Sequence, residues 1–346
     1  MLPLDSDHKR LFGFYFIAGL VLFHCGCQGQ PKAKLIRYRQ TRLHLGTIVH
    51  LNVCATPNDR QRMDQAFSRT WAMFDHIYAR MSPWDPESDV FRINHTYPQP
   101  VQVDCVTYKV IEAAVHYSAL TNGAFDITVL PLDSLWSDHQ TKRIIPDHQL
   151  LLEKKQYVGS HYLKLIPPDR VQRLSPNTRV DLGGIAKGYA IDEAARIFRE
   201  EGFHDFYIEA GGDVYGGGVN CQGRPWQIGI RHPRQPRKIF DVLALNDMAA
   251  TTSGDYVRFF VVDEQRWSHI INPITGYPQR GVASATVVAP RAMTADALST
   301  ALCILTHRMG LPIIEAMGPG YAALILEEDA DGRLRSYPSE RYVKYR

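Results

Sequence analysis

The fold is decided at residues 180–192, which read VDLGGIAKGYAID. This pattern predicts a buried strand that leads through two adjacent glycines into a helix. Gly183 and Gly184 have no Cβ, so the backbone can approach a ligand closely there. The amides that open the helix can face an anion, an arrangement that the helix dipole favours. Asp181, at the expected end of the strand, is placed to accept hydrogen bonds from a heterocycle or to help hold a metal.

A tight strand-to-helix turn with a surface lysine at Lys187 would produce the same stretch without any ligand. Short glycine motifs often occur by chance. The order of residues matches neither the phosphate-binding loop of nucleoside triphosphatases nor the glycine fingerprint of dinucleotide-binding folds. Other parts of the chain therefore have to distinguish a ligand site from a simple turn.

Length and composition set broad limits. The chain has 346 residues, enough for one large domain or two modest ones. A composition of 45% hydrophobic and 22% charged residues is ordinary for a globular protein. The formal net charge of +3 is small and no long basic run is present, so we expect no nucleic-acid partner. The six cysteines show no metal-type clustering outside the N-terminal region.

The N-terminal region has the pattern of a targeting segment. A short basic group at 8–10 precedes an apolar run at 11–23, which is too short to span a bilayer comfortably. A small residue and then Cys27 follow, as in a bacterial lipoprotein signal, although ordinary secretion with cleavage nearby would give a similar pattern. We expect a signal segment at 1–27, a polar tether at 28–34 and one domain at 35–346. The mature protein is then exported, on the periplasmic side, and anchored to a membrane by lipid.

Hydrophobic periodicity predicts the fold class. Residues 47–53 alternate as in a strand, whereas apolar residues between 63 and 81 recur at helical steps of three and four. Further strands are expected at 206–210, 226–230, 241–245, 256–262 and 267–271. Many strands at short spacing imply a largely antiparallel sheet with helices packed on it, an α/β (α+β) fold.

Several local expectations follow from the same patterns. Asp104 is expected to cap a helix that ends near Leu120, and Thr294 to cap a later helix. The polar stretch 133–150 is expected to be a surface loop. An Asn-Gly turn is expected to place Phe125 and Asp126 at the edge of a strand. The hydroxyl-rich segment 251–256 is expected to connect two strands, either as a plain polar hairpin loop or with its hydroxyls facing a phosphate.

Two further positions suit catalysis or metal binding. Asp296 and Thr300 lie four residues apart, so a helix places both on one face. Their oxygens suit magnesium or calcium, although spacing alone favours a local hydrogen bond between them. His269 lies beside a Pro/Gly turn, where a lone histidine is more often structural than catalytic. Trp84, in a loop flanked by prolines, can stack on a planar ligand or pack over the core.

Taken together, these segments resemble the ApbE family of FAD:protein FMN transferases. The matching segments, in chain order, are 45–47, 82–94, 123–128, 181–192, 210–213, 252–256, 269–278 and 295–302. Each is short, but eight in this order and spacing are specific, and they cover residues 40–310. The resemblance implies a two-lobed enzyme that binds FAD with magnesium between its lobes. It would move FMN from FAD onto a threonine or serine hydroxyl of an acceptor flavoprotein, with AMP leaving.

The resemblance also implies roles for individual residues. Positions that match flavin or adenine contacts are Leu45, Trp84, Ala124, Phe125, Asp126, Asp181, Lys187 and Ile270. Positions that match metal ligands are Gly184, through its main-chain carbonyl, Asp296 and Thr300. His269 matches a histidine proposed to act in the transfer step.

Two positions depart from the family pattern. Leu45 stands where methionine is usual, so apolar bulk is kept while the polarizable sulfur is lost. Asn272 stands where aspartate is common, which removes a carboxylate beside the turn that follows His269.

The sequence leaves the chemistry open at two points. His269 is the first choice of general base because its ordinary pKa lies near neutrality, and Asp255 is a competitor. The same diphosphate site with water as acceptor would be a magnesium-dependent FAD pyrophosphatase. A flavin-binding lipoprotein without activity is a third alternative.

Overall fold

The computed structural model describes residues 34–142, 144–256, 259–262 and 265–346. The expected signal segment, with Cys27, and all of the expected tether except Lys34 lie outside the described residues. Residues 35–346 form one compact unit.

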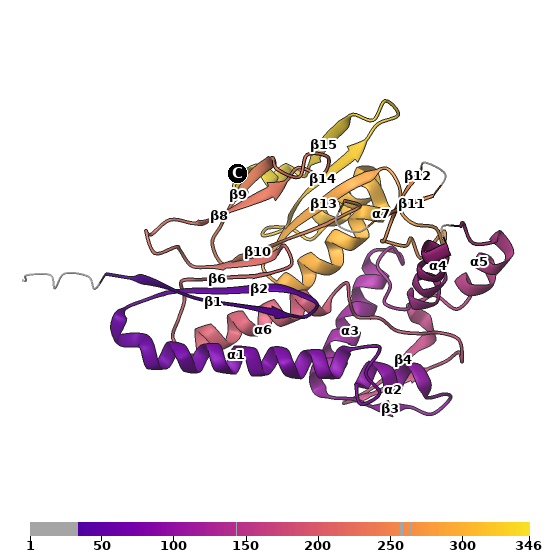
Figure 1. The fold of residues 1–346 in the computed structure, drawn as a ribbon, viewed down its shortest axis with the longest axis horizontal. Coiled ribbons are helices and arrows are strands. Elements are labelled where there is room, and N and C mark those ends of the chain that lie inside the picture. The colour runs from indigo at the N-terminus through magenta and orange to yellow at the C-terminus, as the bar shows by residue number, and fades with distance from the viewer. Residues whose placement is uncertain (1–33, 143, 257–258, 263–264) are drawn as a thin grey trace, which may run out of the picture. The chain divides into compact units, whose positions relative to one another are not determined.

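The fold is built on an eight-stranded sheet in which every neighbouring pair is antiparallel (Figure 1). Its strands, in spatial order, are β1 (Ile36–His44), β2 (Thr47–Ala55), β6 (Phe206–Ala210), β7 (Asp213–Gly217), β10 (Met248–Gly254), β13 (Val282–Ala289), β14 (Ala322–Glu328) and β15 (Leu334–Pro338). The expected strands at 47–53 and 206–210 are confirmed, as is the mixed fold class with an antiparallel sheet.

Alternating side chains of the sheet enter two separate hydrophobic cores. One face packs against α1 (Arg60–Met81), α6 (Ala186–Glu200) and α7 (Ala292–Ala316), and forms the main core. The opposite face packs against the hairpin of β8 (Trp226–Arg231) and β9 (Ile239–Leu245) and against a 3-10 turn at Glu340–Tyr345. Because successive strand residues point to opposite faces, Val214 enters the second core and Tyr215 the first.

The remaining elements lie beside this framework (Figure 1). The helices are α2 (Asp89–His95), α3 (Cys105–Leu120), α4 (Leu130–Lys142) and α5 (His148–Lys155), with short 3-10 turns at Pro57–Asp59 and Ser160–Tyr162. A small antiparallel sheet contains β3 (Val101–Gln102), β5 (Arg170–Arg173) and β4 (Leu163–Ile166), and a separate hairpin contains β11 (Phe259–Val262) and β12 (Gln265–Ser268).

Local sequence determines several of these elements. In α1, the apolar residues spaced by three and four, from Met63 to Met81, are buried against the sheet. Asp104 caps α3 as expected, and its carboxylate accepts a hydrogen bond from Val106 N at 2.9 Å. Helix α6 ends before Gly202, whose φ of 79° is the left-handed conformation typical of a helix stop.

The expected surface loop at 133–150 is wrong, because α4 and α5 occupy most of it. Leu132, Trp136 and Leu151 are buried in a third cluster together with Trp267 and Ile271. The stretch is mostly polar and its few apolar residues show no clear helical repeat. The two helices are therefore not evident from the sequence, and their apolar residues are buried by contact with Trp267 and Ile271.

Three expectations about strands also need correction. Residues 251–254 do not form a loop but belong to β10, where they pair with β13; Thr251 is buried, and Thr252 and Ser253 are partly buried. The residues before Gly183 form only an isolated bridge, between Arg179 and Val129, so neither 180–182 nor 125–126 lies in a strand. The hairpin strands β11 and β12 are shorter than the expected 256–262 and 267–271.

Helix α7 begins at Ala292, so Thr294 lies inside it and is not its cap. The Thr294 hydroxyl instead lies 2.6 Å from the hydroxyl of Tyr117 on α3. By length and composition α7 could cross a membrane, but its backbone breaks at Thr306 (φ 59°) and half of its most apolar window is buried within the described fold. Its first half is the core helix under β10 and β13.

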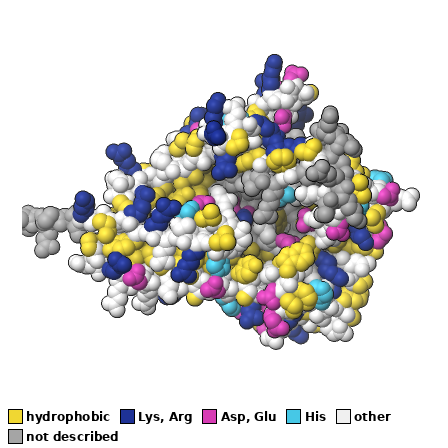
Figure 2. Space-filling model, in the orientation of Figure 1, with side chains coloured by type: hydrophobic (Ala, Val, Ile, Leu, Met, Phe, Trp, Pro, Cys, Tyr) yellow, Lys and Arg dark blue, Asp and Glu magenta, His cyan; other side chains and the backbone are white. Residues whose placement is uncertain are grey.

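A disulfide joins Cys54, at the end of β2, to Cys221 in the loop before β8, while Cys105 and Cys303 are unpaired. Figure 2 shows basic and acidic side chains interspersed with hydrophobic ones on the visible face.

Candidate functional site

The site is organised by the crossing of α6 over the start of α7. Gly188 lies at the crossing point, where an added Cβ would come within 2.4 Å of the carbonyl oxygen of Ala292. Its amide donates a hydrogen bond to the Asp296 carboxylate at 3.0 Å. A glycine in the organising stretch is therefore needed for helix packing as well as for ligand approach.

Asp192, on α6, supplies the cap that α7 lacks. Its carboxylate accepts hydrogen bonds from the amides of Ala292 (2.6 Å) and Met293 (3.2 Å), and Arg291 pairs with it at 3.4 Å. Burial raises the pKa of Asp192 to about 6, although these donors oppose the shift. The contact fixes the start of α7 and with it the position of Asp296.

Three charged side chains meet where these helices approach the sheet. Lys187 Nζ pairs closely with Asp213 Oδ2 and lies 3.5 Å from Asp296 Oδ1. Both carboxylate residues are buried, at 4% and 3% exposed. Burial alone would lower the pKa of Lys187, but the two carboxylates outweigh it and raise this pKa above its ordinary value. Burial, together with the charge of Asp296, raises the pKa of Asp213.

Backbone turns bring Asp213 to this place. Gly211 and Gly212 have φ values of 64° and 95°, which favour glycine, and they reverse the chain between β6 and β7. The Gly211 amide donates to the Ile48 carbonyl at 3.2 Å, so this turn lies beside the β1–β2 turn. Leu45, a predicted flavin contact, is in that second turn with a φ of 51°.

The predicted metal ligands lie close together. An added Cβ on Gly184 would be 3.7 Å from Thr300 Oγ1 and 3.3 Å from the ring of Phe125. Ser253 Oγ on β10 lies 3.3 Å from Thr300 Oγ1, and Asp296 is one turn before Thr300 on α7. No three His, Cys, Asp or Glu side chains gather as a metal site in the described part of the chain. One carboxylate, hydroxyls and a main-chain carbonyl are hard oxygen donors, which fit magnesium rather than a soft metal.

The predicted flavin contacts at 124–126 are buried behind this cluster. Ala124 and Phe125 are 1% and 3% exposed. The Asp126 carboxylate accepts hydrogen bonds from the hydroxyls of Ser118, Thr128 and Ser160 and from the amides of the latter two. Its side chain is therefore fully used in holding the fold, which leaves the main chain for any contact with a ligand.

Asp181 lies at the entrance to the glycine turn. Its carboxylate accepts a hydrogen bond from the Gly183 amide. Burial raises the pKa of Asp181, although this hydrogen bond opposes the shift. Trp84 is 75% exposed in the loop after α1, with no packing role that would account for a large apolar side chain there.

His269 and Ile270 follow β12 in a second region. Ile270 is 8% exposed and joins the main core, whereas His269 is exposed. Asn272 accepts the amides of Ile274 (2.8 Å) and Thr275 (3.3 Å), so it shapes the turn after His269.

Asp255 has a defined partner that limits its chemistry. Arg234, between β8 and β9, donates to both of its carboxylate oxygens, at 2.6 and 2.9 Å, and also to Glu328 at 2.6 Å. Both oxygens of the Asp255 carboxylate are therefore engaged by the Arg234 guanidinium.

Sequence reasoning missed two residues of this site. No role was predicted for Asp213. The signal that could have indicated one is the Ala-Gly-Gly-Asp pattern at 210–213, a glycine turn after a strand that ends in a carboxylate. Ser253 was noted only as part of a polar loop. Its position beside Thr300 depends on β10 being a strand under α7, which no local pattern indicates.

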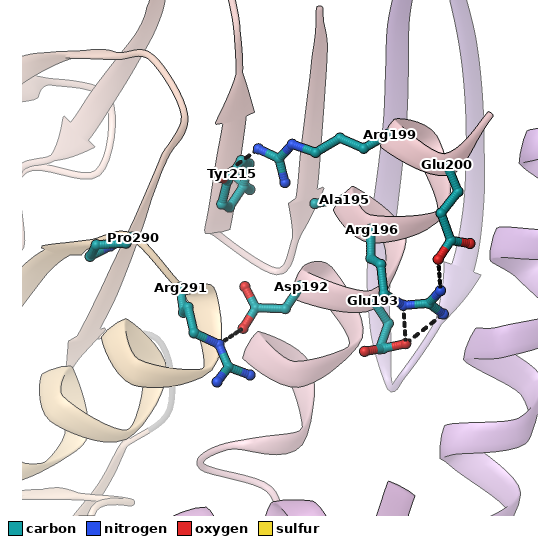
Figure 3. Close-up of a pocket in the computed structure, with 9 residues that line it drawn as sticks. All are labelled: Asp192, Glu193, Ala195, Arg196, Arg199, Glu200, Tyr215, Pro290 and Arg291. Atoms are coloured by element: carbon teal, nitrogen blue, oxygen red, sulfur yellow. Dashed lines mark hydrogen bonds and ion pairs between the residues drawn. The ribbon is translucent and has the colours of Figure 1, made fainter. Parts of the chain in front are cut away.

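A cavity of about 520 Å³ opens over the second half of α6, away from these residues (Figure 3). None of the predicted site residues lines it. Its acidic groups are already paired, Asp192 with Arg291 and both Glu193 and Glu200 with Arg196. The predicted site residues on α6 and α7 therefore lie at the Lys187 end of α6 and not around this cavity.

Known proteins match this chain over most of its length. A protein from Haemophilus influenzae named FAD:protein FMN transferase is 31% identical over 317 residues, which cover 89% of this chain and 90% of that protein. One of the same name from Vibrio cholerae is 34% identical over 249 residues, covering 70% and 74%.

Solved structures give the same result. The flavin transferase ApbE from Vibrio cholerae has a TM-score of 0.80 at 28% identity and covers 90% of this chain and 100% of that one. The ApbE protein from Thermotoga maritima has a TM-score of 0.79 at 34% identity, with 90% and 99% coverage. Since the ApbE family model also matches residues 45–325, the chain belongs to the ApbE family.

Proposed function

We propose that this protein transfers FMN from FAD to a threonine or serine hydroxyl of an acceptor flavoprotein and releases AMP, with magnesium as cofactor. The observation that supports this most is the buried cluster of Lys187, Asp213 and Asp296 beside Thr300 and Gly184, in a chain of the ApbE family. A fixed ammonium, hard oxygen donors and an exposed glycine backbone suit a diphosphate.

Binding of the FAD diphosphate is assigned to the start of α6. The Ile185 side chain makes no capping hydrogen bond, and the Gly188 amide in the first turn donates to the Asp296 carboxylate, so the protein neutralises only part of the positive end of the dipole. Lys187, in the first turn, adds a full positive charge. Gly183 and Gly184 let the diphosphate approach the main chain without a Cβ in between.

Magnesium would be held by the Asp296 carboxylate, the Thr300 hydroxyl and the Gly184 carbonyl. In this position it would neutralise the charge that develops on the diphosphate oxygens. The donor set fits, because Asp296 and Thr300 share one face of α7 and Gly184 lies against Thr300.

The transfer step is a displacement at the phosphorus atom of the FMN half. The acceptor hydroxyl oxygen forms a new bond to that phosphorus, the bond from phosphorus to the bridging oxygen breaks, and AMP leaves with the bridging oxygen. His269 accepts the hydroxyl proton, since it is exposed to an incoming protein and Asp255 is occupied by Arg234.

We further propose that the protein is exported and held on the periplasmic side of a membrane by a lipid on Cys27. The apolar run at 11–23 and the residues before Cys27 support this. The Cys54–Cys221 disulfide supports it independently, because disulfides persist mainly in oxidising compartments. Cys27→Ser should release the protein from the membrane fraction. A variant that stays membrane-bound would contradict the anchor.

The decisive experiment measures the intact mass of an acceptor flavoprotein domain after incubation with this protein, FAD and magnesium. A gain of one FMN unit, lost when the acceptor threonine or serine is replaced by alanine, would support the transferase. Free FMN and AMP without a mass gain would indicate a pyrophosphatase instead. FAD binding without turnover, on acceptors that a related transferase modifies, would indicate a flavin-binding protein.

A further inference from the structure

The metal ligands proposed above raise a conflict of charges within the site. Lys187 Nζ lies 3.5 Å from the Asp296 oxygen that faces it, and Asp296 is the carboxylate assigned to magnesium. An ammonium and a divalent cation at one buried carboxylate repel each other, with little water to screen them. Either the metal displaces the lysine, or another group has to keep the lysine in place.

Asp213 is that other group. Its contact with Lys187 is closer than that of Asp296, and the glycine turn between β6 and β7 fixes it from the opposite side. Asp296 has a further partner of its own in the Gly188 amide, which keeps its second oxygen oriented without the lysine. The two carboxylates are therefore not equivalent, and Lys187 belongs mainly to Asp213.

We propose that Asp213 is a positioning residue that holds the Lys187 ammonium away from Asp296, so that lysine and magnesium act together on the diphosphate. This inference rests on the proposed function, because it requires a metal at Asp296. The charges agree with it. Two buried carboxylates and one ammonium leave a net charge of −1, and a divalent cation changes this to +1, which attracts an anionic diphosphate.

The main alternative is that Asp213 itself binds the metal. The two roles differ in what happens when Lys187 is removed as well. If Asp213 only positions Lys187, replacing Asp213 should not lower metal affinity once the lysine is absent. If Asp213 is a metal ligand, replacing it should lower metal affinity with or without the lysine. The variants Asp213→Asn, Lys187→Met and the double variant Lys187→Met/Asp213→Asn separate these cases.

The experiment titrates Mn²⁺, a paramagnetic substitute for magnesium, into the protein without FAD and follows free Mn²⁺ by electron paramagnetic resonance. We expect Asp213→Asn to weaken Mn²⁺ binding by about tenfold or more, because Lys187 then pairs with Asp296 alone. The double variant should recover at least the wild-type affinity. Asp89→Asn is the matched control, since Asp89 is buried and paired with Arg92 on α2, far from these residues in the fold, and it should leave Mn²⁺ affinity unchanged.

Two outcomes would overturn the inference. Unchanged Mn²⁺ affinity in Asp213→Asn would show that Asp213 has no role in metal binding. If the double variant binds Mn²⁺ as weakly as Asp213→Asn does, Asp213 is a metal ligand. If Asp213→Asn does not fold, the variant Lys187→Met provides the test. It should bind Mn²⁺ more tightly than wild type, and equal or weaker binding would contradict a competition between Lys187 and the metal for Asp296. Wild-type protein that binds no Mn²⁺ and transfers no FMN would instead refute the proposed function.

Discussion

The two regions that carry the candidate site are built differently. Lys187, Asp213 and Asp296 lie on α6, β7 and α7, which are joined to the main core of the sheet. His269 lies in a loop after β12, and a small cluster around Trp136 and Trp267 supports that loop. The difference suggests a division of labour. In the proposed function, the diphosphate and metal would be held by a buried framework, while the proposed proton acceptor lies on an exposed loop.

The contacts of the two regions agree with this. On the framework side, the Gly188 amide of α6 donates to the Asp296 side chain of α7, and the Asp192 carboxylate accepts from the first two amides of α7. On the loop side, Trp136 stacks on Trp267 at 5.3 Å between ring centroids, and its Nε1 donates to the Gly276 carbonyl at 2.8 Å. Changes in the first region should therefore alter binding as well as turnover, and changes in the second should alter turnover alone.

The largest effect is expected for Asp296→Ala. It removes the carboxylate assigned to magnesium and a partner of Lys187, so FMN transfer should fall to near background and FAD affinity should weaken when magnesium is the only metal. The rate of mass gain on the acceptor and an FAD titration measure the two effects. Thr294→Val, two residues earlier on α7, is the control and should keep transfer. Full activity in Asp296→Ala would refute the metal assignment.

His269→Ala should lower turnover by about a thousandfold, because a positioned general base contributes on the order of 10²–10⁴ in rate. FAD affinity should stay close to wild type, since His269 is exposed in the loop after β12, whereas the residues proposed to bind the diphosphate lie on α6, β7 and α7. Steady-state turnover and an FAD titration separate the two quantities. A parallel loss of FAD affinity would make His269 a binding residue and remove the contrast between the regions.

Asp192→Asn tests the link between α6 and α7 through pH. The folded pKa of about 6 lies above the ordinary value of 3.8, so wild-type Asp192 favours folding below pH 4 and loses this contribution as pH rises through 6. The free energy of unfolding of Asp192→Asn relative to wild type should therefore increase by about 2 kcal/mol from pH 4 to pH 7. Urea unfolding across this range measures it. A pH-independent difference would show that burial does not perturb this carboxyl.

Trp136→Phe should have the smallest effect, a fall of a few-fold in turnover with unchanged FAD affinity. The phenyl ring keeps the apolar contact with Trp267 and loses the hydrogen bond to Gly276, which is worth about 1 kcal/mol. Trp226→Phe is a matched control, because Trp226 also donates its Nε1 to a main-chain carbonyl, that of Gly217, but at the start of β8. Equal losses in both variants would mean that the effect is general destabilisation.

The sequence by itself determined the elements whose signals are local. The spacing of apolar residues from Met63 to Met81 defines α1, and Asp104 and Gly202 mark where α3 begins and α6 ends. Asp296 and Thr300, four residues apart, lie on one face of α7 as the helical repeat requires. The eight short segments also identified the family, because eight matches in the same order along the chain are far more specific than any one of them.

Only the tertiary structure decided how distant segments meet. Thr294 is not the cap of α7 because the helix begins two residues earlier, where the carboxylate of Asp192, a hundred residues before, accepts from the amides of Ala292 and Met293. The polar stretch at 133–150 is helical because Trp267 covers its few apolar residues. The pairing of Lys187 with Asp213 depends on two turns that approach from opposite sides. Such contacts leave no periodicity in the sequence, since their free energy comes from groups that are neighbours only after folding.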